Sequence, residues 1–477
     1  MKNQYENPLT TRYASAEMSR IFSPDNKFIT WRKLWIALAK GEQALGLPIE
    51  DAQIDEMIAQ IDNIDYALVA EKERALRHDV MAHVHAYGVA CPKAKGIIHL
   101  GATSAYVGDN TDIIVYREGL LLVRKRLLNL IARLKRFALR YKDLPTLGFT
   151  HFQPAQLTTV GKRATLWIQD LMIDLKDLIY LIEGIQFLGV KGTTGTQASF
   201  MDLFDDDEEK VKKLETYVAK EMGFDKCYGV SGQTYPRKFD SRVMNVLSGI
   251  AQSLSKFAHD IRLLQHLKEI EEPFEKSQIG SSAMAYKRNP MRSERISSLA
   301  RHIIVNTLNP AMTAATQWFE RTLDDSANKR IALSEGFLAT DAILLIATNV
   351  AGGMVVYPEV IEQRIMAELP FMATENIIME GVKNGGDRQE LHEKIRILSM
   401  EAGRVVKEEG KPNDLMQRII ADGSFGIQEA DSALLLKPEK YIGRAPQQVE
   451  EYLSGEVQPI LEAFKEEINT KEIELTV

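Results

Sequence analysis

Hydrophobic residues recur at intervals of three and four along several long stretches of the chain that contain no proline. Leucines follow this spacing almost without interruption from Tyr116 to Lys142, and stretches 166–178, 243–267 and 331–350 continue it. Such spacing places apolar side chains on one face of an α-helix, whereas an internal proline would cost a helix about 3 kcal/mol. Alternating patterns typical of strands are scarce. We therefore predict a nearly all-α protein with long central helices.

Helices of this length bury their apolar stripes by packing in a bundle. Bundles of this kind often extend between subunits, so oligomerisation is expected. Turn-rich residues at 101–110 and the sequence Val356–Pro358 suggest two domain boundaries. The resulting expectation is an N-terminal helical domain over 1–110, a long-helix bundle over 111–357 and a C-terminal helical domain over 358–477.

Composition narrows the class of protein. The chain has 477 residues, of which 45% are hydrophobic and 26% charged, as is usual for soluble globular proteins. Its net charge of −7 argues against a general nucleic-acid binder, although a local basic pocket remains compatible with it. Cys91 and Cys227 are too few for a disulfide framework and fit a reducing cytoplasm. The N-terminus lacks the apolar core of a secretory signal. The apolar stretch 342–357 is shorter than the roughly 20 residues of a membrane span, so a buried helix is expected there.

Chemistry is expected in the polar, glycine-bearing segments between the long helices. The loop 278–290 contains Gly280, Ser281, Lys287 and Asn289, whose donors suit a carboxylate. A solvated surface loop explains the same composition. A Ser–Lys hydrolase pair is a third reading, since Lys287 follows Ser281 by six residues, but no nucleophile-elbow glycine pattern surrounds the serine.

Two further polar segments lie between predicted helices. His151 stands between Pro145 and Pro154, which predicts a non-helical loop. This histidine could transfer a proton near neutral pH, or it could be a hydrogen-bonded structural residue. The small hydroxyls of Thr103 and Ser104 follow a glycine, and they suit either an anion or a helix cap.

The segment 74–85 is rich in histidine. His83 and His85 are two residues apart, so on a helix they face different directions and no metal site is predicted. His78 and Asp79 could form an oriented imidazole pair. Alternatively, they belong to a helix-surface ion pair with Arg77.

A basic segment lies near residue 325. Arg321 and Arg330 could grip a phosphate together with Ser326. A continuous helix would place residues nine apart on opposite faces. For Arg321 and Arg330 to reach the same phosphate, Arg321 must precede a helix that starts near Asp324 or Asp325. Simple ion pairing of Arg321 with a nearby carboxylate is the alternative.

Taken in order, these segments resemble a known family. The loop 280–290 resembles the Gly-Ser-Ser-x-Met-Pro-x-Lys-x-Asn-Pro signature of the fumarase/aspartase superfamily, with Ala285 where proline is usual. Six further stretches resemble the adenylosuccinate lyases of that superfamily, closest to the animal-type enzymes. They are 11–15, 77–79, 101–104, 150–156, 191–196 and 321–326. The resemblance covers almost the whole chain.

The resemblance implies a three-domain, mainly α-helical subunit in a homotetramer, with each active site assembled from three subunits. The implied activity is cleavage of adenylosuccinate to AMP and fumarate. The same site would release fumarate from the succinyl-aminoimidazole-carboxamide ribotide of purine synthesis. No cofactor, metal, nucleic acid or membrane partner is implied, and the expected location is the cytoplasm.

The resemblance also implies roles for individual residues. Ser281 would be the general base and His151 the general acid, with His78 and Lys287 near the reacting groups. The phosphate would lie against Arg12, Tyr13, Arg321, Ser326 and Arg330. The succinyl and base portions would contact Thr103, Ser104, Gln233 and Arg295. The remaining substrate-binding candidates are Arg77, Asp79 and Asn289.

Two alternatives stay open at this point. Another lyase of the superfamily, such as argininosuccinate lyase or fumarase, acts on a substrate without phosphate, which would leave the arginine groups without a purpose. Some superfamily members serve as structural proteins, as in eye-lens crystallins, with catalysis lost. The presence of His151, Ser281 and Lys287 argues against that reading.

Overall fold

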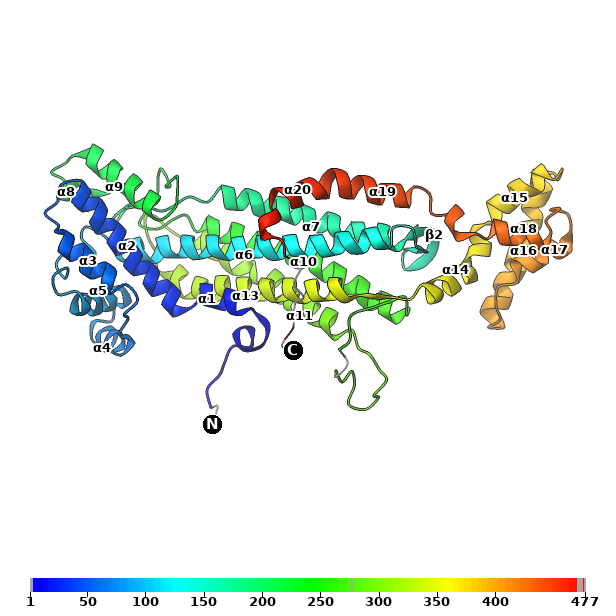
Figure 1. The fold of residues 1–477 in the computed structure, drawn as a ribbon, viewed down its shortest axis with the longest axis horizontal. Coiled ribbons are helices and arrows are strands. Elements are labelled where there is room, and N and C mark those ends of the chain that lie inside the picture. Colours follow the sequence, from blue (N-terminus) through cyan, green and yellow to red (C-terminus); the bar gives the residue numbers. More distant parts are fainter. Residues whose placement is uncertain (1–2, 276–277, 470–474, 476–477) are drawn as a thin grey trace.

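The computed structural model describes residues 3–275, 278–469 and 475. The chain forms an elongated, almost entirely helical molecule, so the all-α prediction is confirmed. Long helices run along its middle, a cluster of shorter helices covers the end formed by the N-terminal part, and a second cluster lies at the opposite end (Figure 1).

Five helices build the central bundle. They are α6 (Ser104–Arg140), α7 (Val160–Glu183), α10 (Lys238–His266), α11 (Met291–Asn306) and α13 (Asp324–Gly353). Leucines seven apart on α6, such as Leu120, Leu127 and Leu134, are completely buried because α7 and α13 pack against that face. The short helix α12 (Leu308–Thr316) packs on α10 and α13. Each of the four stretches predicted from leucine spacing is therefore a bundle helix.

Helix α13 is the most apolar element of the bundle. By length and composition alone it could cross a membrane, yet 78% of its most apolar window is buried inside the protein. The apolar stretch 342–357 forms the last turns of this helix and the short strand β4 (Val355–Val356). Its apolar character is explained by neighbouring helices, which cover it on most sides.

One end of the bundle carries the N-terminal helices. These are α2 (Pro24–Ala44), α3 (Asp51–Ala59), α4 (Tyr66–Leu76), α5 (Asp79–Ala90), α8 (Ala198–Leu203) and α9 (Glu208–Glu221). Trp31, Trp35 and Tyr87 form the aromatic centre of this end. Before them, the single wide turn η1 (Leu9–Tyr13) and α1 (Ala16–Ile21) lie against α13. The first residues of the chain therefore contact the central bundle, and the helices α2 to α5 at its end follow them in sequence.

A β-hairpin connects α6 to α7. Strands β1 (Pro145–Thr150) and β2 (Gln153–Thr159) pair antiparallel, with Thr150 opposite Gln153. His151 and Phe152 form the two-residue turn with φ of 54° and 58°. Turns with two positive φ values normally use asparagine or glycine, so this backbone is held in a costly conformation. The predicted non-helical segment is the exposed tip of a hairpin.

A second pair of short strands anchors the loop that carries Ser281. Strand β3 (Ile270–Glu271) pairs antiparallel with β4 (Val355–Val356), which follows α13 directly. The chain then leaves this sheet and returns at the start of α11. The loop is thus tied at its base, and it extends below the bundle in Figure 1.

The C-terminal lobe, residues 358–444, forms the other end of the molecule. It contains α14 (Pro358–Met372), α15 (Thr374–Lys383), α16 (Arg388–Glu408), α17 (Leu415–Asp422), α18 (Glu429–Leu435) and η2 (Pro438–Lys440). Leu391, Ile419 and Phe425 belong to a small core of its own, separate from that of the bundle. This separate core gives the lobe its own packing unit.

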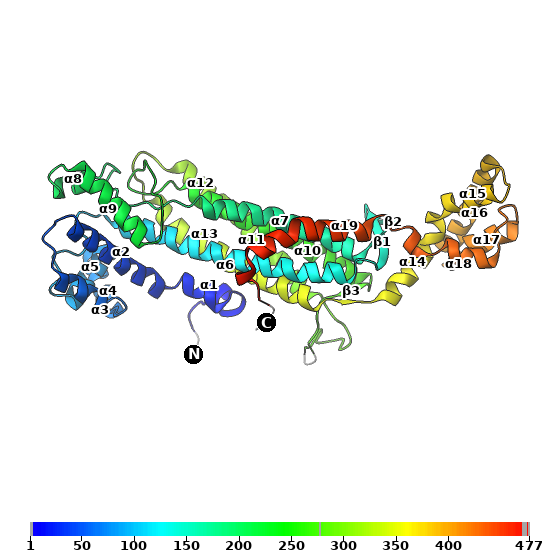
Figure 2. The same cartoon turned by 45° about the horizontal axis from the view of Figure 1, so that its top comes forward.

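The chain then returns to the bundle. Helices α19 (Ala445–Tyr452) and α20 (Gln458–Ala463), with turns η3 (Leu453–Val457) and η4 (Lys465–Glu467), run back along α7 and α6 (Figures 1 and 2). Val449, Leu453 and Val457 join the main core. The division into three domains stays a prediction. Helix α6 runs across the first expected domain boundary, at residue 110. The prediction also did not include the return of the C-terminal segment to the bundle.

The crossing of α6 and α7 yields a stability prediction. A Cβ atom at Gly161 would lie 2.3 Å from the carbonyl oxygen of Ala138 and 2.6 Å from the Cα of Lys142. Both are backbone atoms, so the helices must separate to admit a side chain. We expect Gly161→Ala to lower the free energy of unfolding by about 2 kcal/mol, measured by equilibrium urea unfolding.

A matched glycine gives the control. Gly403 lies inside α16, and a Cβ there would meet nothing within 4 Å. Gly403→Ala should raise stability by up to about 1 kcal/mol, since alanine favours the helix. A Gly161→Ala protein as stable as the parent would show that this crossing is not tightly packed.

Candidate active site

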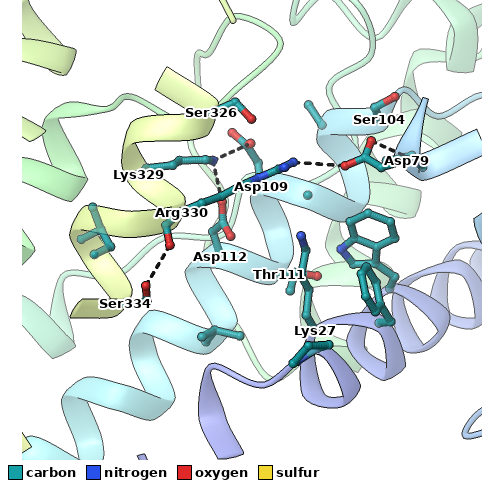
Figure 3. Close-up of a pocket in the computed structure, with 18 of the residues that line it drawn as sticks. Lys27, Asp79, Ser104, Asp109, Thr111, Asp112, Ser326, Lys329, Arg330 and Ser334 are labelled. Atoms are coloured by element: carbon teal, nitrogen blue, oxygen red, sulfur yellow. Dashed lines mark hydrogen bonds and ion pairs between the residues drawn. The ribbon is translucent and has the colours of Figure 1, made fainter. Parts of the chain in front are cut away.

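A cleft of about 800 Å³ opens between α2, the start of α5, α6 and the first turns of α13. Figure 3 shows its polar lining. Eight residues predicted from the sequence line it: Arg77, His78, Asp79, Ser104, Gln233, Arg321, Ser326 and Arg330. They come from four separate parts of the chain, so folding brings together much of the predicted substrate-binding set.

The structure places Arg321, Ser326 and Arg330 along the same cleft. Helix α13 begins at Asp324, so Arg321 precedes it and escapes the helical spacing. Its Nη1 donates to both carboxylate oxygens of the buried Asp325, at 3.0 and 3.1 Å. Ser326 and Arg330, one turn apart, face the same cleft from the helix itself. The alternative of ion pairing also holds, because the ion pair is what orients Arg321.

Buried ion pairs form the wall behind these residues. Arg237 donates from Nε to Asp325 at 2.5 Å and from Nη2 to Asp109 at 3.0 Å. Lys329 Nζ lies 2.5 Å from Asp112 and 3.5 Å from Asp109. Burial acts to raise the pKa of Asp109, but Arg237 and Lys329 outweigh it and lower that pKa. The wall therefore stays charged on both sides.

Asp79 links α5 to α13 across the cleft. Its Oδ2 lies 3.1 Å from Arg330 Nη2. Burial acts to raise the pKa of Asp79, but the Val80 amide, Arg330 and Lys27 together lower it. The carboxylate is thus ionised and holds Arg330 in place over the cleft, as the dashed line in Figure 3 shows.

His78 is oriented from both ring nitrogens. It caps α5, where Nδ1 accepts the amide proton of Met81 at 3.2 Å. Nε2 lies 3.2 Å from the hydroxyl oxygen of Ser104, the first residue of α6. Because Nδ1 is an acceptor in the cap, the neutral ring carries its proton on Nε2 and donates it toward Ser104. Neither sequence reading holds as stated: Met81 and Ser104 orient the His78 ring, whereas Asp79 pairs with Arg330 rather than Arg77.

A second group of predicted residues lies along the middle of the bundle. The ring of Tyr13 lies between two guanidinium groups, with its centroid 5.9 Å from Arg12 and 5.6 Å from Arg295. The turn η1 supplies Arg12 and Tyr13, and α11 supplies Arg295. None of the three lines the cleft. Thr103 is the N-cap residue of α6, next to Ser104 but outside the lining.

The three remaining loop residues lie on the segment between β3 and α11. The hydroxyl oxygen of Ser281 accepts the amide protons of Ala283 and Met284 at 3.3 and 3.2 Å. Asn289 Nδ2 donates to the carbonyl oxygen of Gly280 at 2.7 Å, which closes the loop on itself. Lys287 is exposed. None of the three lines the cleft, and the loop that carries them lies below the bundle, away from α2 and α5 (Figure 1).

His151 lies at the far end of the molecule. Ser104 begins α6, and the hairpin that bears His151 follows its last turn. Helix α6 has 37 residues, which corresponds to about 55 Å. A single chain therefore does not bring His78 and His151 to one substrate.

Sequence reasoning missed several residues of the cleft. Asp109 and Asp112 are three apart on α6 and so share a face, a signal that the polar run after Gly108 contained. Lys329 adjoins a predicted arginine. Lys27, on α2, had no signal, since one lysine in an amphipathic helix is typical of a solvated face. Among the residues that the structure describes, no group of three or more histidine, cysteine or acidic side chains is placed to hold a metal ion.

Comparisons with known proteins agree with this fold. The family described as "Lyase" matches residues 26–305, and the family described as "Adenylosuccinate lyase C-terminus" matches residues 370–452. A solved 3-carboxy-cis,cis-muconate lactonizing enzyme from Pseudomonas putida superposes with a TM-score of 0.80 at 22% identity, covering 94% of this chain and 98% of its own. A fumarate lyase from Mesorhizobium sp. BNC1 gives 0.78 at 22% identity, covering 95% and 100%. At such identities these two structures support the fold alone.

Relatives of higher identity are found among adenylosuccinate lyases. The enzyme of Schizosaccharomyces pombe is 54% identical over 99% of both chains, and that of Saccharomyces cerevisiae is 54% identical over 100% of this chain and 99% of its own. The enzyme of Schistosoma mansoni is 48% identical over 97% of both. The match thus extends to fungal as well as animal enzymes.

The helical fold and the cleft, together with the first family match, define a lyase of the fumarase/aspartase superfamily. Within that superfamily, the chain belongs to the adenylosuccinate lyase family. It is accordingly an enzyme, a carbon–nitrogen lyase.

The buried wall of the cleft can be tested at Asp325. This carboxylate is fully buried and pairs with both Arg237 and Arg321. Removing one partner of a buried ion pair leaves the others uncompensated, so Asp325→Asn should cost about 3 kcal/mol of stability. Thermal and urea unfolding measure this loss.

The neighbouring Asp324→Asn is the control. Asp324 is exposed and accepts from Gln317 at 2.8 Å, so its neutralisation should cost less than about 1 kcal/mol. Equal losses from the two variants would contradict the role given to Asp325.

Proposed function

We propose that this enzyme cleaves adenylosuccinate to AMP and fumarate, and that the same site releases fumarate from the succinyl-aminoimidazole-carboxamide ribotide. The observation that carries the proposal is the cleft, where Arg321, Ser326 and Arg330 converge opposite His78 and Ser104. The first group suits a phosphate and the second suits a carboxylate. Full-length identity of 54% to enzymes named adenylosuccinate lyase supports the same substrate.

The reaction is a β-elimination. A base removes a proton from the carbon beside one succinyl carboxylate, the electron pair of that C–H bond forms the double bond of fumarate, and the C–N bond breaks. An acid protonates the departing nitrogen. Negative charge builds up on the carboxylate before the amine leaves, so fixed cations and donors lower the barrier. We assign this stabilisation to Lys287 and Asn289.

Ser281 is the proposed base. An ordinary hydroxyl is a weak base at neutral pH, so its alkoxide must be favoured. The amides of Ala283 and Met284 already donate to its oxygen, and hydrogen bonds to a charged form stabilise that form. Lys287, six residues further along the same loop, would add positive charge when the loop closes over substrate.

His151 is the proposed acid. It lies at the exposed tip of the hairpin, in a turn whose two positive φ values are costly for non-glycine residues. Strain of this kind is typical of functional segments, because it persists only where the surrounding structure holds the backbone in place. An exposed tip can reach a neighbouring subunit, whereas it cannot reach the cleft of its own.

We further propose that active sites are shared between subunits of a homotetramer. If His78 and His151 act on one substrate, the length of α6 requires them to come from different chains, and we propose that Ser281 comes from a third. An exposed apolar stripe supports the association. Leu166, Ile173 and Tyr180 are seven residues apart on α7 and are 45%, 55% and 71% exposed. This spacing is that of a helix face that packs against another helix.

The activity is tested by following the loss of adenylosuccinate absorbance with purified protein. His151→Ala and Ser281→Ala should each lower kcat by at least about 10²-fold while the oligomer stays intact by size-exclusion chromatography. His392→Ala and Ser432→Ala, both in the C-terminal lobe, are the matched controls and should retain full activity. Absence of turnover by the wild-type protein would favour the structural alternative, and near-normal rates from either active-site variant would overturn its assigned role.

Sharing is tested by complementation. Inactive His151→Ala and Ser281→Ala proteins are unfolded together and refolded as mixed oligomers. If each site takes these residues from different chains, about a quarter of the sites in an equal mixture recover both side chains. Mixed tetramers that stay inactive would contradict shared sites.

A further inference from the structure

Among the residues that the structure describes, Lys27 is a cation of the cleft with no carboxylate partner. It extends from α2, half-buried, and its Nζ lies 5.2 Å from the ring centroid of Phe28 and 5.1 Å from that of Trp31. Within the described parts of the chain it makes no hydrogen bond or ion pair with a carboxylate. An ammonium held only by aromatic faces is poorly compensated for the water it has lost.

The acidic groups that face Lys27 are already engaged. Asp112 pairs with Lys329 at 2.5 Å, and Asp79 pairs with Arg330 at 3.1 Å. Burial lowers the pKa of Lys27, and Arg330 and Lys329 add to this effect, while the two carboxylates oppose it. Figure 3 shows Lys27 reaching from α2 into the space between α6 and α13. Three positive side chains, Lys27, Lys329 and Arg330, thus approach one region of the cleft, where Asp79 and Asp112 are already paired with the last two.

Two buried hydrogen-bond groups in the same lining are also unsatisfied. Trp31 is 2% exposed and Thr111 is 1% exposed. Neither Trp31 Nε1 nor Thr111 Oγ1 has a hydrogen-bond partner among the described residues. Lys27 and Trp31 are four apart on α2 and therefore share a face, and Thr111 faces the cleft from α6. Buried polar groups are normally paired, so this cluster points to a ligand.

We propose that Lys27, with Trp31 and Thr111 beside it, forms a subsite for the phosphate group of the nucleotide substrate. The proposal rests on the proposed function and extends it to a residue that the family resemblance did not supply. A phosphate dianion would lie between the Lys27 ammonium and the Arg330 guanidinium, on the α13 side where Ser326 also lies. The succinyl carboxylates would lie nearer Ser104 and His78. A cleft of about 800 Å³ has room for a whole nucleotide.

The test replaces the charge and keeps the shape. Lys27→Met retains an unbranched stem against Phe28 and Trp31 but removes the ammonium. We expect KM for adenylosuccinate to rise by about tenfold or more, as for loss of one charged hydrogen-bond partner, while kcat changes little. Lys27→Arg should restore much of the affinity. Lys33→Met, on the exposed face of the same helix, is the matched control and should leave KM unchanged.

The phosphate is identified with partial ligands. Inhibition by AMP should weaken in Lys27→Met as much as substrate binding does, whereas inhibition by fumarate should not change. The phosphate-free nucleoside of adenylosuccinate should bind wild type and Lys27→Met equally, an outcome that a merely structural role for Lys27 would not produce.

The outcomes separate this proposal from the proposed function. If wild type turns over adenylosuccinate and Lys27→Met keeps its KM and its inhibition by AMP, the subsite is wrong and the activity stands. If Lys27→Met instead loses inhibition by fumarate, Lys27 faces the dicarboxylate and the phosphate assignment is overturned. If wild type shows no turnover, the proposed function fails, and AMP binding to wild type and Lys27→Met by calorimetry still decides whether Lys27 holds a phosphate.

Discussion

The stiffness of the long helices is the constraint on which the rest of the structure depends. A helix of 37 residues, buried along one face by α7 and α13, cannot bend to bring its ends together. Every functional candidate is therefore placed at a defined position along the bundle: the cleft at one end, Tyr13 and Arg295 in the middle, Ser281 on the loop beside it, and His151 at the other end. The helix packing that stabilises the fold therefore also keeps the candidate functional residues of one chain far apart.

Electrostatics in the cleft explains how an acidic protein suits an anionic ligand. The net charge of −7 is a sum over the whole chain, and interactions between exposed charges are largely screened beyond about 10 Å. Inside the cleft, Asp79, Asp109 and Asp325 are each paired with a basic side chain, which they hold in position. These carboxylates orient cations without surrounding all of them. Among the described residues, Lys27 is a cation of the cleft that no carboxylate pairs with directly.

Local patterns in the sequence predict the local parts of the structure. Leucine spacing predicts α6, α7, α10 and α13, because the spacing reflects the burial of one helix face. The position of Arg321 before its helix is predictable, since helical geometry allows no other convergence with Arg330. The type I′-like turn at His151 is not, because its residues are unusual for positive φ. Lys27 also escapes prediction, since only folding brings α2 beside α6. The family resemblance supplies eight of the residues that line the cleft, yet it contains no distances.

The C-terminal lobe has a topological consequence. The polypeptide leaves the bundle once through α14 and comes back once through the segment before α19, and the lobe between these two crossings keeps its own core around Phe425. The lobe is therefore a subdomain that is joined to the bundle by two chain connections. Exchanging it for the equivalent unit of a relative would require two new junctions and a match at Leu436 and Tyr441, which pack against both cores. Chimaeric enzymes with mixed lobes are therefore accessible without rebuilding the bundle.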